Sequence, residues 1–336
     1  MTSIIRIPES KMRSEFFRIL RSVGFSIDKA DKCSEIFTTN SLEGIYSHGV
    51  NRFPRFIKNT IDGFIKSDAE PTLTHSAGAL EQWNGNLGPG PLNAAFATNR
   101  AMTLASKGGI GLVALANTNH WMRGGTYAWQ TAREGYVFIG WTNTDANMPA
   151  WGAIDARLGN NPLVLGLPFE DEAIVLDFAM TQFSYGKMEA YQMEGKNLPF
   201  PGGFNKAGEL SSDPAEILDT KRPLPIGYWK GSGLSLLLDI LAAILSGGMA
   251  THEITKNGNE AGLSQVFIAI SLDKLADIKS VDNIVKRIIT DFKKSEKENL
   301  NTSVRYPGES VLIVRGENTR NGIPVNRIIW EKIMAL

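Results

Sequence analysis

The chain has little cysteine and no excess of charge of either sign. Cys33 is its single cysteine in 336 residues, so an internal disulfide and a cysteine-rich metal site are both excluded. Cys33 lies among apolar residues in a helical pattern, which predicts an inert thiol that fills the core. Lys and Arg total 35 and balance 35 Asp and Glu. We therefore see no electrostatic reason to expect nucleic acid or an anionic membrane as partner.

Long hydrophobic runs are also lacking. The first ten residues contain Arg6 and Glu9 and no apolar run of the kind found in signal peptides. The most apolar stretch, residues 234–245, contains Asp239 and is shorter than the ~20 residues that span a bilayer. It predicts a buried helix, and we expect a protein of the cytoplasm.

The standard signatures of several enzyme classes are missing. The dinucleotide fingerprint fails because Leu236 stands where the third glycine should follow Gly231 and Gly233, and no P-loop occurs. His252 is followed by Lys256 where a zinc protease needs histidine, and none of the four histidines pair at metal-ligand spacing. A serine nucleophile elbow is absent as well. We predict no metal site, and a nicotinamide cofactor would need a site of another design.

What the chain does contain is a pattern of helices and short strands. Helical spacing runs over residues 12–23, 28–42 (with Asp28 as N-cap), 54–64, 92–106, 127–134 and 281–297. Strand-like apolar runs cover residues 111–116, 137–141, 163–167, 173–177, 265–272 and 310–315. The mixture predicts an α/β (mixed α+β) fold with a helical N-terminal region.

The length suits two closely packed domains. We expect a helical terminal domain of residues 1–75 plus 300–336, and a cofactor- and substrate-binding domain of residues 76–299. Within it, residues 196–227 hold five of the chain's 15 prolines and predict a long irregular excursion of the kind that often carries function.

The segment around His48 offers a general acid beside an anion-binding group. His48 precedes Gly49 at a helix–loop–helix junction, and Arg52 follows four residues later, on the same face of a helical turn. Histidine is the usual proton donor near neutral pH, and the planar guanidinium matches a carboxylate. The alternative is a surface histidine beside a solvated arginine.

A polar loop at residues 117–125 follows the strand predicted at 111–116. Loops at the carboxyl ends of strands are where α/β proteins tend to place ligands, so His120 could bind substrate or order water. The alternative is a structural turn in which His120 and Trp121 pack against a neighbour.

Two further positions could meet a cofactor, and a third segment reads as a simple turn. Asp177 ends a predicted strand and could bind ribose hydroxyls or orient a histidine, or could simply cap a helix. Trp229 and Lys230 precede the predicted buried helix, where backbone N–H groups and a cation suit an anion. Residues 306–309 form a turn that we expect to open a strand.

Five motifs occur in a fixed order: Tyr46-Ser-His-Gly-Val-Asn-Arg-Phe-Pro-Arg-Phe56, Asn119-His-Trp-Met-Arg-Gly-Gly125, Phe183-Ser-Tyr-Gly186, Gly227-Tyr-Trp-Lys-Gly-Ser-Gly233 and Pro307-Gly-Glu309. Together they resemble the type-2 malate/L-lactate dehydrogenase family over nearly the whole chain. The resemblance implies a non-Rossmann nicotinamide site on a mixed sheet, in a homodimer that holds the cofactor partly at the subunit interface.

The resemblance also implies roles for individual residues. It makes His48 the proton donor and assigns cofactor contacts to Ile174, Val175, Leu176, Asp177, Phe178, Ala179, Trp229, Lys230, Gly308 and Glu309. The chain departs from many relatives at Met180, where a side-chain hydroxyl is common, and at Trp121, where Phe or Tyr is common.

The expected reaction is reduction, with NADH or NADPH, of the C2 carbonyl of a 2,3-diketo sugar acid. Arg52, with Arg55 as substitute, would grip the carboxylate, and His120, Thr142 and Asn143 would line the substrate pocket. Asp177 either contacts the cofactor or orients His48. The alternatives are another 2-hydroxy or imino acid (malate, lactate, sulfolactate, ureidoglycolate), a sugar-acid binding protein without redox chemistry, and a metal-dependent lyase.

Overall fold

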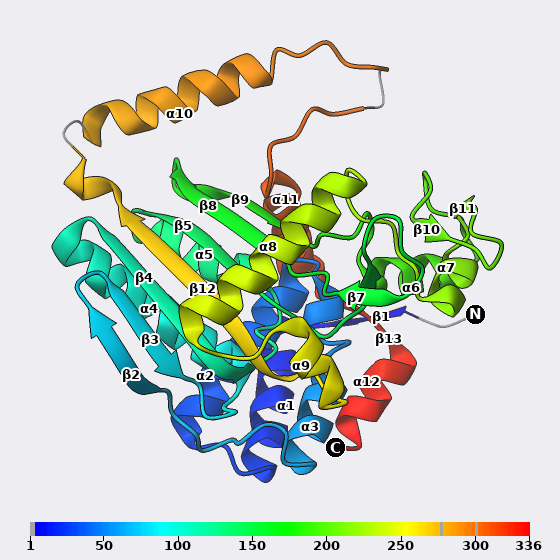
Figure 1. Cartoon of the computed structure of the whole chain (residues 1–336), viewed down its shortest axis with the longest axis horizontal. Helices are drawn as coiled ribbons and strands as arrows, with labels where there is room; N and C mark the ends of the chain where they lie inside the picture. Colours follow the sequence, from blue (N-terminus) through cyan, green and yellow to red (C-terminus); the bar gives the residue numbers. More distant parts are fainter. Residues whose placement is uncertain (1–3, 276–277, 300–301) are drawn as a thin grey trace.

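The computed structural model describes residues 4–275, 278–299 and 302–336, without the side chains of residues 278–280. In the described chain a seven-stranded sheet forms the centre, with strand order β2-β3-β4-β12-β5-β8-β9 (Figure 1). β3 and β4 are parallel and the other neighbouring pairs are antiparallel. The sheet is therefore mixed, which confirms the predicted fold class.

The strands of this sheet are β2 (Thr72–Ala77), β3 (Leu80–Asn84), β4 (Ile110–Asn119), β5 (Tyr136–Thr142), β8 (Leu163–Phe169), β9 (Glu172–Phe178) and β12 (Ala261–Ser271). The short strands form separate antiparallel pairs: β1 (Ile4–Ile7) with β13 (Ile323–Asn326), β6 (Met148–Pro149) with β7 (Ala156–Leu158), and β10 (Gly203–Phe204) with β11 (Leu210–Ser211).

The helices are α1 (Glu9–Ser22), α2 (Ile27–Leu42), α3 (Phe53–Ile61), α4 (Gly90–Gly108), α5 (Gly124–Arg133), α6 (Tyr185–Met193), α7 (Pro214–Thr220), α8 (Trp229–Ser246), α9 (Thr251–Lys256), α10 (Ile278–Phe292), α11 (Glu309–Asn321) and α12 (Arg327–Met334). Two single 3-10 turns are η1 (Tyr46–His48) and η2 (Leu272–Lys274).

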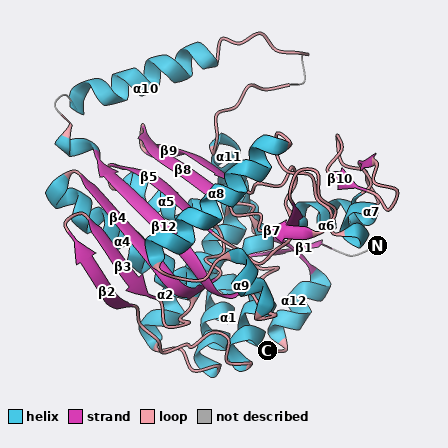
Figure 2. Cartoon of the chain, viewed as in Figure 1, coloured by secondary structure: helices cyan, strands magenta, loops and turns pink. Residues whose placement is uncertain are grey.

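The central sheet is covered on both faces (Figure 2). α4 and α5 pack on one face through small alanines, including Ala97 and Ala101, which meet Val113 and Phe267 of the strands. α8 crosses the other face, where Leu238 and Ala242 contact the cluster that contains Trp141 and Val266. Layers of this kind leave the strand ends free to carry a site.

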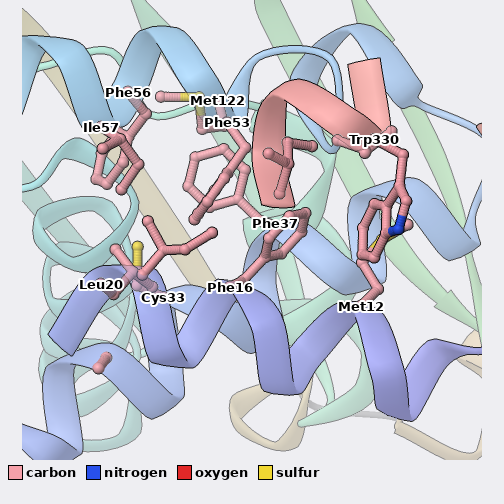
Figure 3. Close-up of a cluster of buried hydrophobic side chains, with 14 of the residues drawn as sticks. Met12, Phe16, Leu20, Cys33, Phe37, Phe53, Phe56, Ile57, Met122 and Trp330 are labelled. Carbon is pink, nitrogen blue, oxygen red and sulfur yellow. The ribbon is translucent and has the colours of Figure 1, made fainter. Parts of the chain in front are cut away.

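A second core joins the two ends of the chain. Phe16 of α1 stacks on Phe53 of α3 at 4.0 Å between ring centroids, and Phe37 of α2 packs edge-on against Phe53 (Figure 3). Trp330 of α12 and the buried Cys33 belong to the same cluster. The prediction that Cys33 fills the core is confirmed, and burial raises the pKa of its thiol far above the usual range. The exact domain boundaries stay a prediction.

α8 differs from the buried helix expected at residues 234–245. It begins earlier, at Trp229, and only one of its faces packs on the sheet. In the described chain it is long and apolar enough, by length and composition alone, to cross a membrane, although 39% of that window is buried within the fold. Its outer face exposes a row of large apolar side chains: Leu234, Leu236, Leu237, Ile240, Leu241 and Ile244.

Three local predictions are wrong. Residues 310–315, predicted as a strand opened by the turn at 306–309, lie in α11. Ser26, not Asp28, caps α2, since its side chain accepts a hydrogen bond from the Lys29 N–H. Residues 196–227 are not wholly irregular, because they contain the β10–β11 pair and α7.

Candidate active site

A cavity of about 440 Å³ opens beside η1, the loop between β4 and α5, the end of β9 and the turn before α11. This volume lies within the roughly 300–1,000 Å³ typical of small-molecule sites. The cavity brings together eight of the residues predicted from the sequence: His48, His120, Val175, Leu176, Asp177, Phe178, Ala179 and Gly308.

His48 ends the η1 turn and is held there by packing and hydrogen bonds. The Asn40 side chain of α2 donates to its backbone carbonyl at 3.0 Å. Gly49, the next residue, lies so close to α2 that a side chain there would collide with Ser41 and the Phe37 carbonyl. The Ser47 hydroxyl lies 3.2 Å from His48 Nδ1. The histidine is thus a fixed, half-buried group at the cavity wall, not a mobile surface residue.

The environment of His48 favours its neutral form. Burial, together with the repulsion of a positive charge by His120, Arg52 and Arg123, lowers the pKa of His48 from 6.5 to about 3. In the absence of a bound anion the imidazole is uncharged at neutral pH, and it can accept a proton.

His120 stacks on His48, with 5.6 Å between ring centroids and an interplanar angle of 14°. Its Nδ1 accepts the Met122 N–H at 2.9 Å, so Nε2 carries the proton of the neutral ring. Met122 adopts a positive φ of 67°, which is uncommon outside glycine. Trp121 is buried against Tyr127 and Phe267. The loop therefore contains a packed tryptophan and a histidine that faces the cavity.

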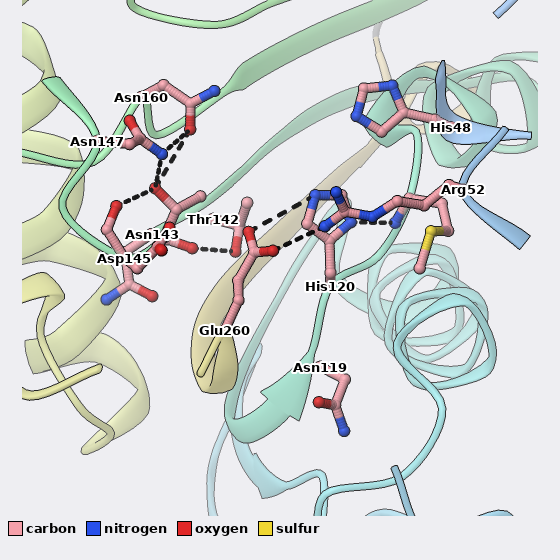
Figure 4. A network of polar contacts seen from close by, with 12 residues as sticks. His48, Arg52, Asn119, His120, Thr142, Asn143, Asp145, Asn147, Asn160 and Glu260 are labelled. Carbon is pink, nitrogen blue, oxygen red and sulfur yellow. Dashed lines mark hydrogen bonds and ion pairs between the residues drawn. The ribbon is translucent and has the colours of Figure 1, made fainter. Parts of the chain in front are cut away.

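Arg52 lies in a small neighbouring pocket that also contains His120. Its Nη2 pairs with Glu260 Oε2 at 2.8 Å (Figure 4). Arg55 reaches the same oxygen at 3.9 Å, and His120 Nε2 lies 3.8 Å from Glu260 Oε1. The arginine predicted to bind the substrate carboxylate is therefore bound to a carboxylate of its own chain.

Thr142 and Asn143 do not line the cavity. The Thr142 hydroxyl donates to the Asn143 carbonyl, and the Asn143 amide donates to Asp239 and to the Met249 carbonyl. The Ser264 N–H donates to Asn143 Oδ1 at 2.8 Å. These bonds tie the end of β5 to β12 and to the loop after α8. Nearby, Thr144 and Asn160 do line the cavity.

The end of β9 and the turn before α11 form the opposite wall. Asp177 accepts the Gly125 N–H at 2.7 Å at the start of α5, and it faces the same cavity as His48. Gly308 has a φ of 92°, and a Cβ there would lie 3.2 Å from the Val175 nitrogen. Glycine therefore lets the turn pack directly on β9, and this packing completes the wall that the resemblance assigns to the cofactor.

The remaining predicted cofactor residues lie outside this cavity. Trp229 begins α8 and is 65% exposed, with Lys230 beside it. Tyr228, just before them, has a positive φ of 61°. Glu309 begins α11 and forms an ion pair with Lys293, and Ile174 is half-buried in β9. Within one chain these residues are not assembled with His48.

Reasoning from sequence missed two charged residues at the site. Glu260 lies in a loop of Asn and Gly, a pattern typical of a turn, so no spacing links it to Arg52. Arg123 lines the cavity and pairs with the buried Glu43, which also binds Arg315 of α11 at 2.5 Å. These partners are far apart in the sequence, and only the fold brings them together.

Among the described residues, no three or more His, Cys, Asp or Glu side chains lie together so that they could hold a metal ion. The polar side chains around the cavity include two imidazoles, one guanidinium, one amide, one carboxylate and three hydroxyls: His48, His120, Arg123, Asn160, Asp177, Ser47, Thr144 and Ser184. This set fits an organic cofactor and a small acid.

The family model for malate/L-lactate dehydrogenase matches residues 7–334. The chain belongs to this family. It is therefore an oxidoreductase that acts on a CH–OH group, and the family implies a nicotinamide cofactor. Its sequence lacks the glycine fingerprint of the Rossmann dinucleotide-binding fold.

Curated relatives align over the full length. A 2,3-diketo-L-gulonate reductase of Salmonella newport (strain SL254) is 45% identical over 99% of this chain and 100% of its own. The protein of the same name from Salmonella typhimurium is 44% identical over the same shares.

Solved structures share the fold. The malate dehydrogenase of Entamoeba histolytica superimposes with a TM-score of 0.93, at 23% identity, over 99% of this chain and 97% of its own. The Δ1-piperideine-2-carboxylate reductase of Pseudomonas syringae superimposes with a TM-score of 0.84, at 23% identity, over 98% and 99%. At these identities the likeness concerns the fold.

Proposed function

We propose that the chain reduces the C2 carbonyl of 2,3-diketo-L-gulonate to the hydroxyl of 3-keto-L-gulonate, and catalyses the reverse oxidation. The observation that carries this proposal is the 45% identity, from end to end, to reductases of that name. The cavity beside His48 supports it, because a fixed imidazole there faces space for a small acid.

His48 is proposed as the proton donor to the alkoxide that forms at C2. The free enzyme holds it neutral, because burial and the charges of Arg52 and Arg123 lower its pKa. A substrate carboxylate beside these arginines would offset their repulsion and raise that pKa, so that His48 carries a proton when it is needed. A well-placed general acid contributes about 10²–10⁴-fold to the rate.

The groups around His48 are proposed to orient the substrate. Arg52 is proposed to bind the carboxylate with its planar guanidinium, with Arg55 as the substitute. The Nε2–H of His120 is available to a substrate oxygen, because its Nδ1 is already engaged by the Met122 N–H. Thr142 and Asn143 support the pocket through their bonds to neighbouring loops, and direct contact with substrate stays a prediction for both.

NADH is the proposed cofactor, with NADPH as the alternative, and when bound it supplies the hydride. Val175, Leu176, Asp177, Phe178, Ala179 and Gly308 of the cavity wall are proposed to hold it. Asp177 is assigned to the cofactor side. Its carboxylate is engaged by the Gly125 N–H at the start of α5, which favours that side over orientation of His48.

A homodimer in the cytoplasm is the proposed form of the enzyme. The exposed apolar row on α8 gives a second copy a surface to cover. Trp229 and Lys230 begin that same helix, so pairing through it would bring them to an interface, where the resemblance expects cofactor contacts. Nucleic acid and membrane are not proposed as partners, since the chain carries no net charge.

A panel of acids tests the function. Initial rates of NADH and NADPH loss at 340 nm would be measured with 2,3-diketo-L-gulonate, pyruvate, oxaloacetate, sulfopyruvate and Δ1-piperideine-2-carboxylate. We expect the highest kcat/KM with 2,3-diketo-L-gulonate and NADH. A higher kcat/KM with another acid would reassign the substrate within the family.

A further inference from the structure

Glu260 lies at the centre of a small cationic cluster beside the active site. It precedes β12, and its side chain is 13% exposed. Two arginines and one histidine surround its carboxylate. Arg52 lies at 2.8 Å and His120 at 3.8 Å (Figure 4), and Arg55 lies at 3.9 Å. Burial raises the pKa of Asp145, the other acid near this cluster, and the charge of Glu260 adds to that rise.

The pocket that contains this cluster has almost no free space. Arg52, Asn119, His120 and Glu260 line a cavity of about 10 Å³. That is about the smallest volume that holds one water molecule, roughly 10–15 Å³. Glu260 therefore fills the space beside the guanidinium of Arg52 that an incoming carboxylate would take within this pocket.

We propose that Glu260 is an internal competitor of the substrate: its carboxylate occupies Arg52 in the free enzyme and yields that position to the carboxylate of a 2-keto acid. This inference rests on the proposed function, in which Arg52 binds the substrate carboxylate. Glu260 thus sets substrate affinity without touching the reacting atoms.

The geometry provides a place for the displaced carboxylate. Glu260 Oε1 already faces the proton-bearing Nε2 of His120, and Arg55 lies at a similar distance from Oε2. A small rotation of the Glu260 side chain would exchange Arg52 for His120 and Arg55, so the carboxylate would keep a hydrogen-bond donor throughout. The exchange costs part of the substrate's binding energy, and that cost appears in KM.

The experiment compares Glu260→Gln with wild type in the NADH-bound protein. The amide has the same shape but no charge, so it competes weakly for Arg52. We expect the Kd of oxamate, a small analogue of a 2-keto acid, to fall at least threefold by fluorescence titration. The KM for the 2-keto acid substrate should fall by a similar factor, with the change appearing in KM rather than kcat. Glu189→Gln, on the exposed face of α6, is the control and should change neither.

Arg52→Ala and the double variant separate the possible failures. The account predicts that Arg52→Ala weakens oxamate binding, and that Glu260→Gln has no further effect when Arg52 is absent. If Arg52→Ala weakens binding but Glu260→Gln leaves the Kd equal or higher, the competition is wrong and the carboxylate clamp stands. If Arg52→Ala leaves the Kd unchanged, both the clamp and the competition are wrong. Glu260→Ala removes the carboxylate without adding an amide, so it controls for an effect of the amide itself. Its melting temperature should first be shown to equal that of wild type.

Discussion

At the scale of single residues, His48 and Arg52 both have partners from distant parts of the chain: His48 stacks on His120, and Arg52 pairs with Glu260. The sequence predicts a role for His48 and Arg52 because their spacing places a general acid beside a carboxylate-binding group. The ion pair of Arg52 with Glu260 spans more than two hundred residues, so no local pattern predicts it. Asp177 and Gly125 are also far apart in the sequence, so no local pattern predicts the hydrogen bond between them.

The depressed pKa of His48 predicts a pH dependence of stability. Its value in the folded chain is about 3, against 6.5 for a free histidine. Between these values the unfolded chain binds more protons, so the free energy of unfolding falls as the pH falls from about 6.5 towards 3. His48→Gln removes that proton uptake, and the slope should become shallower.

Urea denaturation at pH 7.0, 5.5 and 4.5 measures this dependence. His75→Gln, at an exposed histidine of β2, is the matched control. An equal slope in wild type and His48→Gln would contradict the buried, neutral state of His48. Burial also lowers the pKa of His120, so His120 likewise makes the free energy of unfolding fall as the pH falls.

At the scale of elements, long periodic segments are predictable and short apolar runs are not. α1, α2 and α4 follow the spacing of their apolar residues, whereas the run of Val311, Leu312, Ile313 and Val314 suits a strand as well as a helix. It becomes α11 because Gly308 turns the chain at a positive φ and the helix packs beside β9. α8 begins before residue 234, where the prediction starts it, because residues 229–233 are themselves helical.

Gly308→Ala tests the wall formed by α11 and β9. The new Cβ would meet Val175 in a backbone conformation that side chains rarely adopt. We expect a lower melting temperature and weaker NADH binding by fluorescence titration. Gly316→Ala, also in α11, is the control, since a Cβ there meets nothing within 4 Å. It should stabilise the helix by roughly 0.5–1 kcal/mol. If Gly308→Ala binds NADH as tightly as wild type, the turn does not hold the cofactor.

At the scale of the whole molecule, the mixed sheet places the site where layers meet. β4 ends at the His120 loop, β9 ends one residue after Asp177, and the η1 turn between α2 and α3 places His48 at the same cavity. The fold class is predictable from alternating helical and strand-like runs. The order of the strands is not, because β12 inserts between β4 and β5 from far along the chain.

The exposed face of α8 predicts the oligomeric state. We expect the enzyme to elute in light-scattering chromatography at about twice the 36.8 kDa of one chain. Replacing Leu237 and Ile244 by Asp should shift it towards the monomer, because buried apolar area at the interface would become charged. Ile61→Asp, at an exposed apolar residue of α3, is the control. A wild-type monomer, or a dimer that survives both substitutions, would contradict pairing through α8.

The central claim is that His48 transfers the proton in this cavity, and His48→Ala tests it most directly. The variant would be assayed for reduction of 2,3-diketo-L-gulonate, with NADH binding and melting temperature measured in parallel. The account predicts that NADH still binds and that kcat falls about 10²–10⁴-fold, the usual contribution of a general acid. A folded His48→Ala enzyme with kcat close to wild type would contradict it.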